Sequence, residues 1–247
     1  MSIERDVMLV NMAVAKTSKA LRTRAKVKAK TAYHHGDLAR ALVDAAQQLV
    51  EAGGSARLTL RAAAQAAGVS VAAPYRHFVD REALLAAVLA RGFRELARRT
   101  DGARRAAPDA MAGLLAVGLA YVRFGADQPA VYRLMFGPEC DKSAHPDLML
   151  AGHEALSVLI DAVAACKAAG LIGNADVQQV ALAGWSMSHG LASLHADGIL
   201  ASTMPGELDG MARAVMQLLV DGVARRASDI KLPKSPTARQ PRRTAAR

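Results

Sequence analysis

The sequence predicts an all-α fold. Alanine, the residue with the highest helix propensity, occurs 54 times among 247 residues. Aromatic residues make up only 4% of the chain, although 52% of it belongs to the hydrophobic set. Apolar side chains recur at helical spacing between the two ends, and no segment alternates as a strand does. A chain of this length and hydrophobicity can bury one or two cores.

Charge divides the chain into parts of opposite sign. The net charge is +10, but residues 1–35 and 225–247 together carry +13. Residues 36–105 carry +4, whereas residues 106–224 carry −7. This asymmetry indicates a module that faces a polyanion, joined to a module that does not.

Four parts follow from composition and periodicity. They are a basic arm expected to be disordered (1–33), a basic helical domain (34–99), an acidic helical domain (106–226) and a basic disordered tail (227–247). The arm has a basic residue at nearly every second or third position from 13 to 33, so it either lies against phosphates or is a solvated tail.

The first domain is expected to contain four helical segments. Leu38, Leu42, Ala45 and Leu49 mark a helix from Gly36 to the Gly53-Gly54 pair. The next three are a short helix over 60–67 capped by Thr59, a second over 71–78 capped by Ser70, and a longer one from Asp80 to about Arg99.

A hinge is expected over 98–109, and further amphipathic helices follow it. They are marked by Met111 to Val122, by 130–136 after Pro129, by Leu148 to Cys166 after Pro146, by a segment capped by Asn174 or Asp176 that runs to about Ala196, and by Leu208 to Leu219.

Residues 59–78 are the most informative stretch. Gly68 supplies the backbone conformation of a tight turn, and the small Ala64 lets the two short helices cross closely. The second helix would enter a major groove, where the hydroxyl, guanidinium and imidazole groups of Tyr75, Arg76 and His77 can reach phosphates. Ala72 and Ala73 would allow close approach to base edges and thymine methyl groups.

Five segments resemble a known family. YHHGDLARAL (33–42), LTLRAAAQAAGVS (58–70) and APYRHFVDREALL (73–85) resemble, in order and spacing, the DNA-binding domain of TetR-type transcriptional regulators. PAVYRLMFG (129–137) and WSMSHGLASL (185–194) resemble the branch of that family whose ligand domain carries a Trp, a His and a following Gly.

The resemblance implies a two-fold dimer that binds a palindromic double-stranded DNA operator and responds to a small-molecule effector. Residues 34–99 would then be a helix-turn-helix DNA-binding domain, and residues 106–226 an effector-binding and dimerisation domain. The last two helices of the second domain are the expected dimer surface, because paired with their symmetry mates they would form a four-helix bundle. The residues expected at the DNA are Thr59, Arg61, Ser70, Ala72, Ala73, Tyr75, Arg76, His77 and Arg81. Arg81 stands where the family usually has a lysine, and Pro74 removes a backbone donor from the recognition segment. Tyr75 could instead be a core residue with a wet hydroxyl, and His77 a solvated histidine.

An effector cavity is expected in the second domain. Its candidate lining residues are Tyr121, Phe124, Tyr132, Met135, Phe136, Trp185, Met187 and His189. Trp185 and His189 are four residues apart and therefore share a helix face, although the same pattern suits a packed core. The acidic balance of this half disfavours an anionic effector and permits a neutral or cationic lipophilic one.

No enzyme, cofactor or metal is expected. Nucleophile-elbow, phosphate-loop and zinc-protease motifs do not occur, and Cys140 and Cys166 lack metal-ligand or disulfide-framework spacing. No unbroken apolar run reaches the ~18 residues of a membrane helix, and residues 1–14 make a poor signal peptide. We expect a cytoplasmic repressor. The alternatives are a non-specific architectural DNA-binding protein that uses the basic tails, and a helical effector-binding or enzymatic bundle with a vestigial helix-turn-helix.

Overall fold

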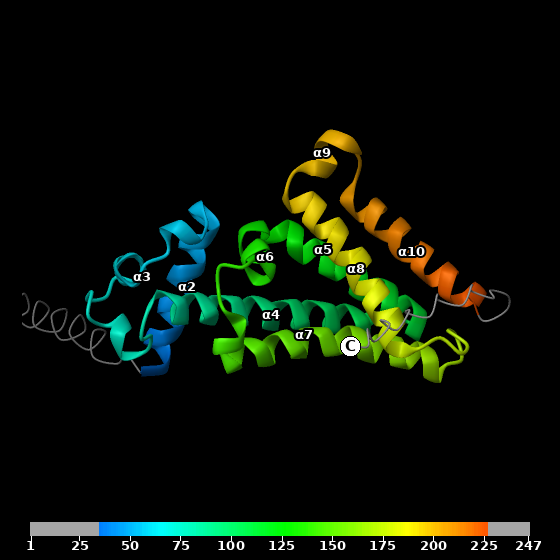
Figure 1. Ribbon diagram of the computed structural model, residues 1–247, viewed down its shortest axis with the longest axis horizontal. Helices are drawn as coiled ribbons and strands as arrows, with labels where there is room; N and C mark the ends of the chain where they lie inside the picture. Colours follow the sequence, from blue (N-terminus) through cyan, green and yellow to red (C-terminus); the bar gives the residue numbers. More distant parts are fainter. Residues whose placement is uncertain (1–34, 227–247) are drawn as a thin grey trace, which may run out of the picture. The chain divides into compact units, whose positions relative to one another are not determined.

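A computed structural model describes residues 35–226, all of whose regular elements are helical (Figure 1). No strand occurs within this range, which confirms the predicted all-α fold. The chain divides between Val88 and Leu89 into two compact units. The predictions for the arm over 1–33 and for the tail over 227–247 lie outside the described residues.

Unit 1 consists of short helices around a small aliphatic core. Its elements are α2 (His35–Gly53), the 3-10 turn η1 (Ser55–Arg57), α3 (Leu60–Ala66), the 3-10 turn η2 (Pro74–Arg76) and the start of α4 (Arg81–Ala106). Leu42, Leu58 and Leu84 are fully buried in this unit. Leu42 and Ala45, from the apolar stripe predicted over 38–49, are therefore core residues of α2.

The turn after α3 forms as its residues predict. The Thr59 hydroxyl oxygen accepts a hydrogen bond of 3.0 Å from the Ala62 amide and so caps the helix. Gly68 has a φ of +68°, and the amides of Gly68 and Val69 donate to the carbonyls of Gln65 and Ala64 at 3.1 and 3.0 Å. This pair of bonds is a Schellman motif, whose left-handed residue favours glycine.

The predicted helix over 71–78 is wrong in its regularity, because only Pro74–Arg76 form a 3-10 turn. Pro74 has no amide hydrogen with which to bond the carbonyl of Ser70, which accepts from the Ala73 amide at 2.9 Å instead. The Pro74 carbonyl then accepts from the amides of both His77 and Phe78. Ser70 therefore precedes a tight, irregular turn and does not cap a regular helix.

The hinge predicted over 98–109 is also wrong, because α4 continues without a break to Ala106. Ion pairs one turn apart support this extension: Glu95 pairs with Arg98 at 2.7 Å, and Asp101 pairs with Arg104 at 2.7 Å. The Arg98 guanidinium, together with Arg99, lowers the pKa of Glu95 to about 2. The connection to the next helix is consequently only three residues long.

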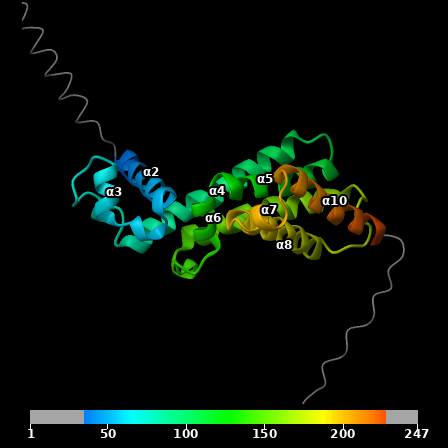
Figure 2. The same ribbon diagram turned by 90° about the horizontal axis from the view of Figure 1, so that it is seen from above.

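Unit 2 is a helical bundle built around α5 (Figures 1 and 2). Besides the rest of α4, it contains α5 (Ala110–Asp127), α6 (Pro129–Phe136), η3 (Lys142–Ala144), α7 (Pro146–Ala168), α8 (Val177–Ala196), α9 (Ile199–Thr203) and α10 (Leu208–Arg226). Helix α5 packs against α7, α8 and α10. Of the two proposed caps for α8, Asp176 is the one that forms, since its carboxylate accepts from the Gln179 amide at 3.0 Å.

Helices α5 and α7 are long and apolar enough to cross a membrane by length and composition, contrary to the expectation from unbroken runs. In the bundle, however, their apolar side chains build the core. Leu114 and Val117 of α5 and Leu159 and Val163 of α7 are buried together in one cluster. Packing between helices therefore accounts for part of the hydrophobicity of these two helices.

Candidate nucleic-acid interface and apolar cavity

The predicted DNA-binding residues cluster on α3, the turn that follows it and the start of α4. The structure places Thr59, Arg61, Ser70, Ala72, Tyr75 and Arg76 at the surface, and leaves Ala73, His77 and Arg81 partly buried. Tyr75 is 62% exposed, so it is not a core residue. The His77 ring is half-buried, with its centroid 6.5 Å from that of buried Phe78, so it is not a freely solvated side chain.

Two exposed arginines offer positive charge to a polyanion. Within the described range 35–226, neither Arg61 nor Arg76 forms an ion pair. No other residue of this range takes up the side-chain donors of these two guanidinium groups. Guanidinium forks match phosphate oxygens in geometry as well as in charge.

Arg81 has a structural role that the sequence did not reveal. Its Nε donates to the Leu58 carbonyl at 2.9 Å, and its Nη2 donates to the Ser55 carbonyl at 2.6 Å. These bonds tie the first turn of α4 to the loop that leads into α3. Because they connect residues more than twenty positions apart, neither helix periodicity nor local motifs could predict them.

Two exposed valines flank the turn over residues 72–78, which we call the recognition turn, and sequence reasoning did not identify them. Val71 is 45% exposed and Val79 is 82% exposed. An exposed β-branched side chain beside polar contacts is suited to thymine methyl groups. The available signal was the position of Val71 next to Ser70, within the same segment as Ala72 and Ala73.

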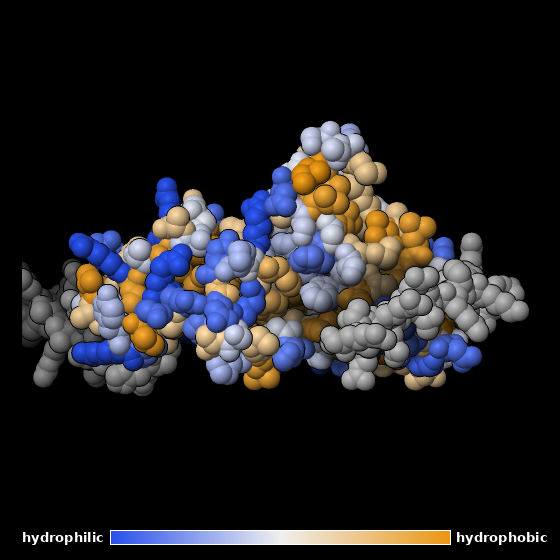
Figure 3. Space-filling model, viewed as in Figure 1, coloured by the Kyte–Doolittle hydropathy of each residue, from blue (hydrophilic) through white to orange (hydrophobic). Residues whose placement is uncertain are grey.

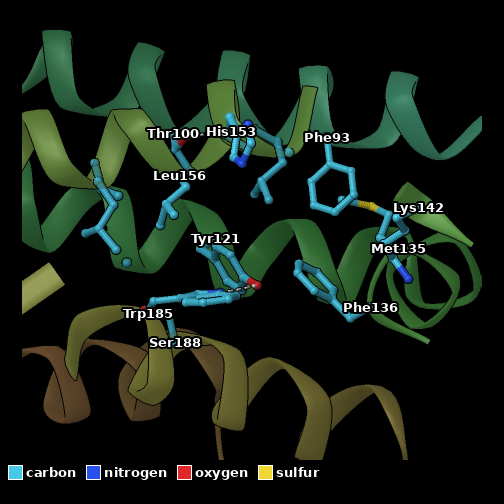
Figure 4. A pocket seen from close by; sticks show the side chains of 16 residues that line it. Phe93, Thr100, Tyr121, Met135, Phe136, Lys142, His153, Leu156, Trp185 and Ser188 are labelled. Atoms are coloured by element: carbon cyan, nitrogen blue, oxygen red, sulfur yellow. Dashed lines mark hydrogen bonds between the residues drawn. The ribbon is translucent and has the colours of Figure 1, made fainter. Parts of the chain in front are cut away.

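Unit 2 contains an apolar cavity of about 410 Å³ (Figure 4). Helix α4 contributes Phe93, Leu96 and Thr100; α5 contributes Val117, Gly118 and Tyr121; α6 contributes Met135 and Phe136; η3 contributes Lys142; α7 contributes Gly152, His153, Ala155, Leu156 and Leu159; and α8 contributes Trp185 and Ser188. This volume lies within the range of small-molecule sites.

Four of the eight predicted cavity residues line it, namely Tyr121, Met135, Phe136 and Trp185. The other four do not. Phe124 is fully buried beneath the Arg99 guanidinium, which lies 5.6 Å from its ring centroid, and Met187 packs against the bundle core. The remaining two, Tyr132 and His189, stand behind the lining residues in a hydrogen-bond network. One helix face thus divides between cavity wall and core, which periodicity alone does not show.

That network joins three helices. The hydroxyls of Tyr121 and Tyr132 lie 3.0 and 2.8 Å from Nδ1 of His189, and the Trp185 indole donates to the Tyr121 hydroxyl at 3.4 Å. The Tyr132 hydroxyl can also donate to the His189 carbonyl at 3.2 Å. These contacts hold α5, α6 and α8 together behind the cavity wall.

Burial sets the protonation of the network. Removal from water raises the pKa of Tyr121 and of Tyr132 above the usual value, so both hydroxyls keep their protons. Burial also lowers the pKa of His189, which favours the neutral ring. Nδ1 of the neutral imidazole can accept a hydrogen bond from the Tyr121 hydroxyl, while the Tyr132 hydroxyl donates to the His189 carbonyl.

Sequence reasoning missed the contribution of α4 and α7 to the cavity. Phe93, Leu96 and Thr100 follow helical spacing on α4, while Leu156 and Leu159 belong to the α7 stripe. Such stripes look the same in sequence whether they face a packed core or a hollow one. A hollow arises only from how the helices meet, so no local signal could have identified it.

Apolar side chains also gather on the surface of unit 2 over α8, α9 and α10 (Figure 3). Leu182 on α8 is 59% exposed and Leu218 on α10 is 67% exposed. Leu194, Ile199 and Met204 add to this apolar surface. Contiguous exposed apolar area of this kind is typical of protein–protein contacts.

Two family models match the chain. Residues 42–88 match the bacterial regulatory proteins of the tetR family, and residues 114–219 match the tetracyclin repressor-like C-terminal domain. The first match covers the turn that carries Tyr75, and the second covers most of the bundle around the cavity. No curated protein matches the chain by sequence.

Solved structures share the fold over most of their length. A protein of unknown function from Rhodococcus sp. RHA1 is 35% identical, with a TM-score of 0.70, covering 78% of this chain and 99% of its own. A tetR-family regulatory protein from Rhodococcus RHA1 is 21% identical, with a TM-score of 0.59 and coverage of 75% and 96%. The regulator FadR from Bacillus subtilis, solved with stearoyl-CoA, is 14% identical, with a TM-score of 0.61 and coverage of 74% and 98%.

Both domain matches and the structural relatives agree with the capped helix-turn-helix and the helical bundle. The two matched segments follow each other in the order that the motifs predict. The chain therefore belongs to the tetR family of transcriptional regulators and is a DNA-binding protein with a helix-turn-helix.

Proposed function

We propose that the protein is a homodimeric repressor that leaves a palindromic operator when a small molecule enters the cavity of unit 2. The observation that carries this proposal is the pairing of an exposed, cation-bearing helix-turn-helix with an apolar cavity in the same chain. Since DNA is its partner, the proposal places the protein in the cytoplasm and assigns it no enzymatic step.

At the operator, contacts to phosphates would position the helix-turn-helix. The Thr59 hydroxyl accepts from its own helix and still has a proton to donate, while Tyr75 and Arg76 project from the recognition turn. Val71 and Ala72 offer methyl groups to thymine, but hydrogen-bonding side chains for base edges are few. Operator choice would then depend partly on DNA shape.

The dimer would form through the apolar surface on α8 and α10. Leu182 and Leu218 are large, exposed and placed on the two helices that the sequence proposed for this role. In a two-fold dimer, each such residue meets the same surface of the partner. Substituting Leu218 with Glu should therefore yield monomers in sedimentation analysis, and an unchanged dimer would remove α10 from the interface.

Effector release would depend on α4, which runs through both units. Its residues Phe93, Leu96 and Thr100 line the cavity, and its first turn is bonded to the loop before α3 through Arg81. A ligand that displaced the cavity-lining part of α4 would thus bias the position of the helix-turn-helix.

The Trp185, His189 and Gly190 spacing further supports assignment to the Trp-His-Gly branch.

The structure of FadR with stearoyl-CoA shows that a related fold can take a lipophilic ligand. For this chain, Trp185→Ala should remove effector-induced release without weakening DNA binding, because Trp185 lines the cavity in unit 2. An unchanged effector response in this variant would exclude Trp185 from the effector site.

The DNA-binding part is tested by Tyr75→Ala and His77→Ala. Both variants should bind all DNA sequences more weakly, with a shallower dependence on salt, while the dimer stays intact. Operator affinity equal to wild type in both would contradict the phosphate contacts. Binding that leaves no footprint and vanishes on removal of residues 1–30 would instead favour the architectural role of the basic tails.

A further inference from the structure

Five of the six polar side chains that line the cavity are hydrogen-bonded within the protein, and His153 is the one that makes no hydrogen bond among residues 35–226. The Thr100 hydroxyl donates to the carbonyls of Leu96 and Ala97, at 2.8 and 3.1 Å. The Ser188 hydroxyl donates to the sulfur of Met216 at 3.3 Å. Neither hydroxyl proton is left for a ligand, so this part of the wall offers a ligand no hydrogen-bond donor.

The aromatic wall is satisfied in the same way. The Trp185 indole donates to the Tyr121 hydroxyl, whose own proton can go to the neutral ring of His189. A ligand with a polar group at this wall would have to break one of these bonds and leave a buried group without a partner, which lowers affinity. The wall therefore selects hydrocarbon.

Lys142 differs from the other lining residues because its side chain ends in an ammonium group. Its ammonium has three donors, and the only hydrogen bond it makes among residues 35–226 is the one to the Gly137 carbonyl at 2.6 Å. No carboxylate in that range pairs with it. Figure 4 shows Lys142 at one end of the cavity beside Met135, with Trp185 on the opposite side of the view.

From this arrangement we infer that the effector is an anionic amphiphile, whose hydrocarbon body fills the cavity and whose carboxylate is bound by Lys142. The inference rests on the proposed function, since it specifies the ligand of the same cavity. It also departs from the expectation drawn from charge balance: the acidic residues of this half lie largely at its surface, whereas the lysine at the cavity is a cation.

The position of Lys142 at one end of the cavity explains why a single negative charge at one end of the ligand would be recognised. A carboxylate can form a charge-assisted hydrogen bond with the ammonium, whereas an alcohol of the same chain length forms only a weaker one. A cationic head group would be repelled by Lys142 and would meet no acid that lines the cavity. The three head groups should therefore bind in the order carboxylate, alcohol, ammonium.

The single tryptophan of the chain provides the measurement, because Trp185 lies in the cavity wall. Dodecanoate, dodecanol and dodecyltrimethylammonium, each kept below its micelle concentration, are titrated into the full-length protein while Trp185 fluorescence is recorded. The test variant is Lys142→Met. The control is Lys167→Met, which removes another lysine that donates to backbone carbonyls, those of Gly173 and Ala175, away from the cavity.

Dodecanoate should change the fluorescence and bind about tenfold more tightly than dodecanol, a ratio that corresponds to about 1.4 kcal/mol. Lys142→Met should remove this preference, because it weakens dodecanoate binding much more than dodecanol binding, whereas Lys167→Met should preserve it. Equal affinity for carboxylate and alcohol in the wild type, or an undiminished preference in Lys142→Met, would overturn the assignment of Lys142. A fluorescence response to none of the three probes would overturn the amphiphile itself.

The outcome for the proposed function is measured separately, as release of labelled operator DNA on addition of dodecanoate. Tight, Lys142-dependent binding without release would support the ligand class and contradict the effector role. Release of DNA with no preference among the three head groups would support the effector role and contradict the ligand class.

Discussion

Replacing Arg81 with Met separates a structural role from contact with DNA. In the structure the guanidinium donates to the carbonyls of Leu58 and Ser55, at 2.9 and 2.6 Å, in partly buried surroundings. Hydrogen bonds to charged groups contribute roughly 1.5–3 kcal/mol each when buried, and partial exposure reduces this, so we expect a loss of about 2 kcal/mol for the pair. For a chain of this size that corresponds to a decrease in Tm of about 4 to 8 °C.

Thermal unfolding followed by circular dichroism measures the loss, and Arg61→Met is the matched control. Arg61 is exposed and forms no ion pair within residues 35–226, so its replacement should leave Tm unchanged while weakening DNA binding. The reasoning would be refuted if Arg81→Met kept the wild-type Tm and lost DNA affinity to the same extent as Arg61→Met. Arg81 would then be a phosphate contact and the bonds to the loop would contribute nothing measurable.

Three further outcomes follow from the fold. Gly118→Ala places a Cβ 2.6 Å from the sulfur of Met216 and should lower the free energy of unfolding by about 1–3 kcal/mol. In Gly152→Ala the new Cβ meets nothing within 4 Å, so this variant should stabilise α7 by up to ~1 kcal/mol. Denaturant unfolding compares the two variants, and equal effects would contradict the packing of Gly118 against Met216. Burial lowers the pKa of His189 in the folded state. The contribution of its neutral ring to the free energy of unfolding is therefore complete above the unfolded pKa of about 6.5 and is lost as pH falls through the folded pKa. Tm should drop between pH 7 and 5 and should drop less in His189→Gln, whereas the same pH profile of Tm in both proteins would show that His189 does not cause the drop. Thr59→Ala removes the cap of α3 and should cost about 1 kcal/mol, measured by the same unfolding curves, and an unchanged midpoint would mean that the cap is not stabilising.

Local chemistry explains what the sequence predicted well. The Thr59 cap and the positive φ of Gly68 involve neighbours in the chain, so residue type and spacing suffice to predict them. The same holds for most helices of residues 35–226, but not for the segment over 71–78 or for the hinge expected over 98–109. The irregular turn at Pro74 also follows from local chemistry, because the sequence shows a residue without an amide hydrogen there. The sequence did not show that the segment over 71–78 would form no regular helix.

Contacts between distant segments explain what the sequence did not predict. The bonds of Arg81 to Leu58 and Ser55, and the approach of Phe93 to a cavity shared with α7, depend on how helices meet in three dimensions. Periodicity identified Phe124 as a cavity residue because it shares the apolar character of α5, yet it faces the packed interior. Helix packing therefore decides which apolar face is core and which is cavity.

DNase footprinting of the purified full-length protein on DNA fragments selected from random sequence tests the central claim most directly. A tetR-family regulator should protect two symmetric half-sites about one helical turn apart, and Tyr75→Ala should lose that protection because Tyr75 is exposed on the recognition turn. Binding of comparable strength to every fragment, with no protected site and no effect of Tyr75→Ala, would contradict sequence-specific regulation by this helix-turn-helix.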